Sequence, residues 1–364
     1  MAQQQALGRY QIATWPGSDD KFIALPGEWF EELKVHDPHD RIVVHAGNRK
    51  TVAKAIFTDE EQLLLTDKLR IALKLPLGPI SAKIVDGKLH FGPFVGLYAL
   101  PSKEPGKPFG ELTAVFRDMF ELAAEEGVSL FVFLPGEVDW EDGVCTAYVY
   151  KPQQGQWMKS KRPLPDLVLP KIMGTPAEWK AKMQHDFTQM ARRVPYGMFS
   201  KNTGSKWDVH RTLSQDEETA AYLPDTRLVK SPWDIEDMLL KHGSVYVKPI
   251  YGTQGRSIYK LDEHPRGGVR LQYTTHGTTR VKRTKRGSVK WQSFLQKKFC
   301  SRRSFLVQEA LDLVCTKGVQ PVDFRWLVQK DRTDRWNVTA RIARVGGSGS
   351  ITTNLHTGGQ AMLA

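Results

Sequence analysis

The sequence has few cysteines and no long hydrophobic run. Its cysteines, Cys145, Cys300 and Cys315, are odd in number and widely spaced, which suits a reducing compartment and argues against a disulfide framework or a zinc site. No stretch of about eighteen apolar residues could span a membrane, and the N-terminus lacks the basic-then-apolar pattern of a signal peptide. We therefore predict a cytoplasmic protein with no membrane partner.

Several catalytic motifs are also missing. The chain contains no HExxH zinc motif, no nucleophile elbow and no GxGxxG dinucleotide fingerprint. These absences leave metalloproteases, serine hydrolases and Rossmann dehydrogenases without support.

Acidic residues are absent from residues 264–308, which hold twelve Lys and Arg and which we call the basic strip. This strip accounts for the whole net charge of +12, because the remaining Lys and Arg equal the Asp and Glu in number. A localised excess suggests one anionic partner site. The strip is either a solvated hairpin and helix face or a site for a phosphate-rich ligand, a nucleic acid or another acidic polymer.

The chain is long enough for several domains, and its patterning predicts an α+β protein with three. Residues 1–92 alternate apolar and polar positions between turn signals and favour a small β-rich barrel-like domain. It is interrupted by short helices at 27–33 and 67–73. An α/β domain is predicted at 93–200 and a third domain at 201–364.

The second domain is predicted to contain one strand–helix–strand unit, at 94–100, 108–125 and 128–134. The last of these runs, VSLFVFL, is apolar on both faces, as in a sheet covered by helices on both sides. Segments 145–151 and 165–172 would extend the sheet, and 174–195 has helical spacing.

In the third domain, residues 207–213 and 232–241 fit helices, the second opened by Ser231 as N-cap. Strands are predicted at 305–310, 322–329 and 336–344.

The segment VYVKPIYGTQGRSIY (245–259) combines a strand, a basic residue, a glycine turn and a second strand. Backbone N–H groups at a glycine turn can surround a polyphosphate, and Lys248 can neutralise it. The segment is not a P-loop, because the lysine precedes the glycines and the next element is a strand. The alternative is an ordinary hairpin with a surface lysine.

Further segments occur in a recognisable order: KWDVHRTL (206–213), YLPDTRLV (222–229), FLVQEAL (305–311), VDFRWLVQKD (322–331) and ARVGGSGSITTNLHTGGQA (343–361). Together with 245–259, they resemble the ATP-grasp ligases and, more narrowly, the endospore coat-associated YheC/YheD family. The earlier segments GKPFGELT (106–113) and PLPDLVLPKI (163–172) are similar to the region that precedes the ATP-grasp unit in that family, although Leu169-Pro170 departs from its pattern.

The resemblance implies an ATP site. Lys248 would reach the α and β phosphates, and the turn would close over them through its glycines and tip. The residues of the turn are Gly252, Thr253, Gln254 and Gly255. The adenine edge and ribose would contact the residues that end the next motif, namely Gln308, Glu309, Ala310 and Leu311.

The last motifs supply the residues for which the resemblance implies catalytic roles. Asp323 and Arg325 point to one face of their strand, where an arginine can clamp a phosphate or a carboxylate; Asp323 is equally interpreted as a structural partner of an arginine. Arg344 matches a phosphate-contacting position, and Asn354 is expected near the triphosphate or the acyl acceptor. His356 is interpreted as structural.

The implied chemistry is Mg-ATP-dependent ligation of a carboxylate to an amine through an acylphosphate, which depends on positioning and charge neutralisation. The expected partners are a nucleotide, a carboxylate substrate and spore coat components. The family's Mg²⁺ ligands are expected after residue 364, so the chain is predicted to be truncated within its ATP-grasp unit, with no metal ligand assigned here. Two alternatives remain: a non-catalytic spore-associated protein that binds nucleotide or is structural, and a protein that binds nucleic acid or an acidic polymer through the basic strip.

Overall fold

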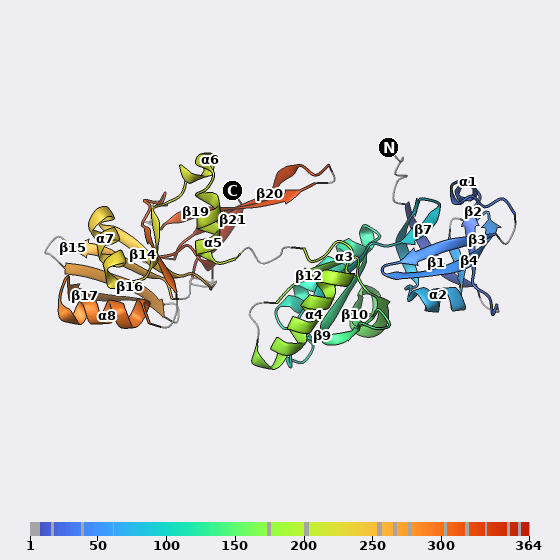
Figure 1. The fold of residues 1–364 in the computed structure, drawn as a ribbon, viewed down its shortest axis with the longest axis horizontal. Helices are drawn as coiled ribbons and strands as arrows, with labels where there is room; N and C mark the ends of the chain where they lie inside the picture. Colours follow the sequence, from blue (N-terminus) through green and yellow to red (C-terminus); the bar gives the residue numbers. More distant parts are fainter. Residues whose placement is uncertain are drawn as a thin grey trace. The chain divides into compact units, whose positions relative to one another are not determined.

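The computed structural model describes most of the chain in two compact units, Met1–Lys201 and Asn202–Ala364, which are treated separately (Figure 1). The described residues are 8–15, 18–37, 40–60, 62–172, 176–199, 204–252, 257–264, 268–275, 278–301, 304–316, 320–331, 333–347, 350–355 and 358–363. The three domain boundaries drawn from the sequence remain predictions.

The first unit begins with a closed barrel in which the strands follow the order β1-β5-β2-β4-β3-β7-β6. Its strands are β1 (Gly8–Trp15), β2 (Phe22–Pro26), β3 (Arg41–Ala46), β4 (Arg49–Thr58), β5 (Leu63–Thr66), β6 (Gly78–Val85) and β7 (Lys88–Phe91). Helices α1 (Glu28–Leu33) and α2 (Asp67–Leu73) lie where the sequence predicts short helices. The barrel-like sheet expected from the alternating pattern is thus confirmed.

A mixed sheet follows in the order β11-β10-β9-β8-β12. Its strands are β8 (Phe94–Tyr98), β9 (Ser129–Asp139), β10 (Val144–Lys151), β11 (Gln156–Pro163) and β12 (Leu167–Pro170). Strands β12, β8 and β9 are parallel, and β10 and β11 extend the sheet in antiparallel pairing. The short 3₁₀ turns η1 (Pro152–Gln154) and η2 (Ala177–Trp179) complete the unit.

Two helices cover this sheet, α3 (Leu112–Glu125) and α4 (Lys180–Arg193) (Figure 1). Val132 of β9 packs in one core with Phe116 of α3, whereas the neighbouring Phe133 belongs to the core that contains Met190 of α4. Because alternate residues of a strand point to opposite faces, both faces of β9 are buried, as its apolar run predicts.

Helix α3 begins at Leu112 rather than at residue 108 as predicted. Gly110 adopts a positive φ of 60°, and Thr113 Oγ1 accepts a hydrogen bond from the backbone N–H of Phe109 at 3.1 Å. This turn occupies the residues that apolar spacing alone assigns to the helix.

The second unit contains an antiparallel sheet in the order β13-β18-β14-β15-β16-β17. Its strands are β13 (Thr226–Val229), β14 (Ser244–Pro249), β15 (Tyr259–His264), β16 (Gly268–Thr275), β17 (Thr278–Lys285) and β18 (Phe305–Glu309). Helices α7 (Pro232–His242) and α8 (Val289–Phe299) share a core with Val245 and Val247 and cover one face. Strand alternation therefore points Tyr246 and Lys248 of β14 to the other face.

The remaining elements of this unit are α5 (Lys206–Leu213), α6 (Glu217–Ala220) and a second sheet, β19 (Val322–Lys330), β20 (Trp336–Val345) and β21 (Gln360–Leu363). Ser231 is the N-cap residue of α7, as predicted, and Asp234 accepts from its backbone N–H at 2.7 Å. Among the helices described here, none has the length and apolar character needed to cross a bilayer.

Candidate nucleotide site

Lys248 lies near the end of β14, on the sheet face opposite the helices. Its Nζ donates a hydrogen bond to Oε1 of Gln308 on the adjacent strand at 2.7 Å and lies 5.0 Å from the ring centroid of Tyr246. Burial, and secondarily the charge of Lys206, lower the pKa of Lys248 to about 8. Within the described residues no carboxylate pairs with this ammonium group, so its charge is available to an anion.

A second lysine joins the turn after β14. Lys206 is the first residue of α5, and its Nζ donates to the carbonyl oxygens of Pro249 at 3.2 Å and Gly252 at 2.7 Å. Burial lowers the pKa of Lys206. Lys206 was not predicted as a site residue, because a lysine at a helix start has no distinguishing sequence signal until the turn is seen beside it.

The glycine turn itself is described only in part. Gly252 has a φ of 124°, a conformation that favours glycine. Thr253, Gln254 and Gly255 lie outside the described residues, so their predicted role stays a prediction.

The end of β18 holds the residues predicted to meet adenine. Gln308 donates from Nε2 to Oγ1 of Thr226 at 2.9 Å, and the backbone N–H of Ala310 donates to the carbonyl of Ser244 at 3.0 Å. Leu311 is exposed. Gln308 thus lies beside Lys248, while Ala310 is fixed by backbone pairing.

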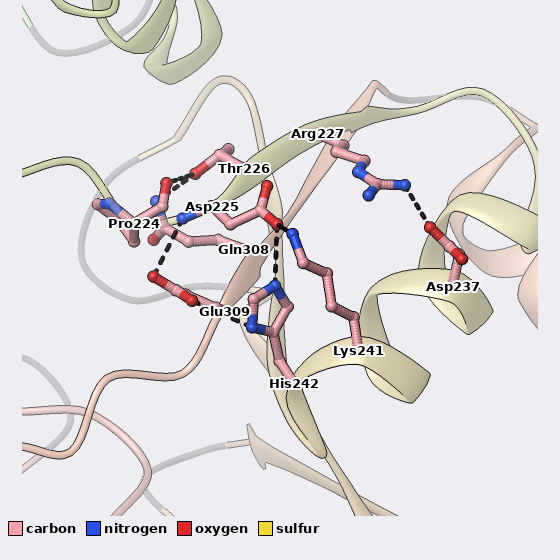
Figure 2. Close-up of polar contacts among 9 residues, drawn as sticks. All are labelled: Pro224, Asp225, Thr226, Arg227, Asp237, Lys241, His242, Gln308 and Glu309. Carbon is pink, nitrogen blue, oxygen red and sulfur yellow. Dashed lines mark hydrogen bonds and ion pairs between the residues drawn. The ribbon is translucent and has the colours of Figure 1, made fainter. Parts of the chain in front are cut away.

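Glu309 belongs to a polar network at this end of the sheet (Figure 2). Its Oε1 accepts from the backbone N–H of Asp225 at 3.1 Å, and its Oε2 lies 3.1 Å from Nδ1 of His242. The other imidazole nitrogen lies 2.9 Å from Oδ2 of Asp225, which also accepts from Lys241 at 2.7 Å. The hydrogen bond from Lys241, and then that from His242, lower the pKa of Asp225 despite partial burial. This network was not anticipated, because its residues come from separate motifs.

The predicted catalytic residues lie around the second sheet. Arg344 on β20 faces Asp323 on β19 and makes a bidentate pair, Nε to Oδ1 at 2.7 Å and Nη2 to Oδ2 at 2.6 Å. Thr353 also donates to Asp323 at 2.7 Å. Arg325 lies opposite Ile342 and is exposed.

A hydrogen bond connects β14 with the segment after β20. The hydroxyl of Tyr246 donates to the carbonyl oxygen of Ile351 at 2.8 Å, next to the segment that holds Thr353 and Asn354. The segment after β20 therefore contacts β14 through Ile351 and the Asp323–Arg344 pair through Thr353. His356 lies outside the described residues.

The basic strip forms β16, β17 and α8. Among its described residues, two arginines have acidic partners: Arg270 pairs with Asp262 at 3.2 Å, and Arg286 pairs with Glu236 at 3.0 Å and with Glu263. In the part of the strip that the structure describes, the exposed cations are Arg280, Lys282, Arg283, Lys285, Lys290, Lys297 and Lys298.

The described residues were also searched for side chains that could bind a metal ion. In the part of the chain that the structure describes, no group of three or more His, Cys, Asp or Glu side chains could hold a metal ion. The residues present therefore assign no Mg²⁺ site.

The chain is similar in sequence to known proteins. Residues 196–364 match the family described as YheC/D-like ATP-grasp. The endospore coat-associated protein YheD of Bacillus subtilis (strain 168) is 30% identical over 302 residues, which cover 82% of this chain and 66% of that protein.

Among solved structures, D-alanyl-alanine synthetase A of Vibrio cholerae O1 biovar eltor aligns at 11% identity and a TM-score of 0.37, over 69% of this chain and 66% of that one. The D-cycloserine synthetase DcsG aligns at 13% identity and a TM-score of 0.38, over 74% and 75%.

The second unit is an ATP-grasp domain. More narrowly, the chain belongs to the YheC/D-like ATP-grasp family, as its motifs suggested.

Proposed function

We propose that residues 202–364 bind ATP, with the triphosphate against Lys248 and Lys206 and the adenine at the end of β18. One observation carries the proposal: Lys206 bonds to the turn after β14, Lys248 lies near the end of that strand, and neither ammonium group pairs with a carboxylate in the described residues. Like charges held together without counter-ions favour a polyanionic ligand.

We further propose that the protein is an ATP-dependent carbon–nitrogen ligase. A carboxylate oxygen attacks the γ-phosphorus and ADP leaves; an amine then attacks the acyl carbon, phosphate leaves, and an amide remains. Such transfer depends on positioning and charge neutralisation. Lys248 and Lys206 would hold the phosphates, and Asp323 would orient the guanidinium of Arg344 toward the reacting groups. Bound Mg²⁺ would supply further neutralisation of phosphate charge.

Association with the bacterial spore coat is part of the proposal, because the curated relative is endospore coat-associated. A nucleotide-binding coat protein without turnover is the alternative within the same fold.

Calorimetric titration of ATP into the protein, with and without Mg²⁺, tests nucleotide binding. We expect Lys248→Met to weaken ATP binding about tenfold or more, since a charge-assisted contact to phosphate contributes about 1.5–3 kcal/mol. Lys230→Met, an exposed lysine between β13 and α7, is the matched control. Equal affinities in wild type and a folded Lys248→Met variant, or no ATP binding by the wild type, would contradict the proposal. ADP release with pooled carboxylates and amines then separates a ligase from a non-catalytic binder.

The exposed cations of β17 and α8 favour one further candidate, an acidic polymer bound to the basic strip. Duplex DNA and polyglutamate are suitable probes. Binding to DNA should weaken with salt, with log K falling by about 0.9 per neutralised phosphate for each unit of log salt concentration. A flat salt response would rule this candidate out.

A further inference from the structure

A buried arginine in the first unit has no acidic partner. Arg162 on β11 is 7% exposed. Its Nη1 donates to Oγ of Ser160 at 2.6 Å and to the carbonyl of Lys161 at 3.1 Å. Its Nε is buried and has no acceptor among the described residues. A buried charge is normally paired, because removing it from water without a counter-ion is costly.

The charges around Arg162 make that cost greater. Burial, and secondarily the positive charge of Arg70, lower its pKa to about 10. No carboxylate of the described residues forms an ion pair with it. Arg70 has its own partner in Asp67, at 3.1 Å, so the uncompensated charge is that of Arg162, and it favours an anion from outside the chain.

Arg162 lines a pocket with room for such an anion. The pocket has a volume of about 540 Å³ and lies between the barrel segment 76–79 and the ends of α3, β9 and β10. Small-molecule sites usually span roughly 300–1,000 Å³. None of the lining residues is Asp or Glu, and Lys151 is a second cation at the wall.

The rest of the wall is mostly apolar. Leu77 comes from the barrel side, Phe120 from α3, and Leu130 and Val149 from β9 and β10. The pocket therefore combines an unpaired guanidinium with an apolar surface.

We propose that this pocket binds a small amphiphilic anion, with its charged head on Arg162 and its apolar tail against Leu77, Phe120 and Leu130. A guanidinium can offer parallel N–H donors to the oxygens of a carboxylate or a phosphate. The site is distinct from the nucleotide site and belongs to the other unit of the chain.

Octanoate and octyl phosphate, titrated into the full-length protein, test the proposal and distinguish a carboxylate head from a phosphate head. We expect saturable binding of at least one probe and no binding of octan-1-ol, which has the tail without the charge. Arg162→Met should weaken the probe at least tenfold. Lys161→Met is the matched control, because Lys161 is the exposed neighbour on the same strand and bonds to Thr146 instead.

The stability of the variant supplies an independent readout. Without ligand, Arg162→Met should melt at the same temperature as wild type or higher, because an unpaired buried charge is replaced by an apolar side chain. The probe should raise the melting temperature of wild type and of Lys161→Met, but not of Arg162→Met. The proposal is overturned if neither probe binds, if octan-1-ol binds equally, or if the probes bind Arg162→Met as tightly as wild type. It is also overturned if Arg162→Met lowers the melting temperature of the free protein, since Arg162 would then be structural. Loss of ATP binding in Lys248→Met leaves this proposal untouched.

Discussion

Gln308 orients Lys248 through a neutral hydrogen bond. Nζ of Lys248 donates to Oε1 of Gln308 at 2.7 Å, and Nε2 of the same amide donates to Oγ1 of Thr226 at 2.9 Å. The amide is thus fixed from both sides, with its oxygen toward the lysine. A neutral acceptor positions the ammonium group without cancelling its charge, so the full charge can act on an anion.

Gln308→Glu tests this arrangement. A carboxylate at the same position would pair with Lys248, and its negative charge would repel a triphosphate. We expect ATP affinity, measured by calorimetry, to fall about tenfold or more, since about 1.4 kcal/mol corresponds to that factor. Gln272→Glu adds the same charge on β16 and should change the affinity much less. Equal losses in the two variants would show a general charge effect instead of a specific pair.

The pKa of Lys248 predicts a pH dependence of nucleotide binding. Its pKa is lowered to about 8, and the protonated form is the one that attracts phosphate. Between pH 7 and pH 9 the protonated fraction falls about tenfold, and ATP affinity should fall with it. Lys248→Arg stays charged over this range and should flatten the profile. A pH-independent affinity in the wild type would contradict the assignment of Lys248.

The lowered pKa of Lys248 has the opposite effect on stability: ATP affinity should fall as pH rises, whereas the free energy of unfolding should rise. The free amine of Lys248 is favoured in the folded state, so the unfolded chain binds more protons between about pH 8 and pH 10.5. The contribution of Lys248 to the free energy of unfolding therefore rises with pH across this window. Lys248→Met should remove that part of the slope in urea denaturation, whereas Lys230→Met should keep it.

His242 is predicted to hold the Asp225–Glu309 network together. Its two ring nitrogens each face one carboxylate, at 2.9 and 3.1 Å. His242→Ala would leave these carboxylates facing each other, at a cost of about 1–3 kcal/mol in the free energy of unfolding. It should also weaken ATP binding, since Glu309 ends the strand proposed to meet adenine. His185→Ala, at an exposed position on α4, should be neutral. An unchanged urea midpoint in His242→Ala would show that the network carries no stability.

The helices and strands could be predicted from the sequence, whereas the hydrogen bonds between residues of different strands could not. Apolar periodicity predicted β9, α7 and β18, because burial of one or both faces requires apolar residues at regular positions along the sequence. The resemblance located Lys248 and Gln308 in their motifs. Their hydrogen bond depends on which strands are neighbours in the sheet. No single motif predicts the strand order, so the hydrogen bond could not be predicted.

The contact of Lys206 and the burial of Arg162 were likewise not predictable from the sequence. Lys206 reaches the turn after β14 only because α5 begins beside Ile250. The backbone N–H of Lys206 donates a hydrogen bond to the carbonyl oxygen of Ile250 at 3.0 Å. Arg162 is a polar residue in a polar stretch, QWMKSKRP, so its burial cannot be inferred from hydropathy. Long-range packing decides both cases.

The Asp323–Arg344 pair yields a prediction for the second sheet. Burial of Asp323 opposes ionisation, but the hydrogen bonds from Arg344 and Thr353 and the charges of Arg344 and Arg325 together lower its pKa. Its stabilising effect is therefore present above the unfolded value of about 3.9 and is lost as pH falls through the folded value. Asp323→Asn should cost about 1–3 kcal/mol near neutral pH, seen as faster amide hydrogen exchange in β19 and β20. The penalty should shrink as pH falls below the unfolded value and through the lowered folded value, because the wild-type carboxylate is then protonated as well. Asp312→Asn, at an exposed position after β18, should leave exchange unchanged. Unaltered protection of β19 and β20 in Asp323→Asn would show that the pair does not stabilise this sheet.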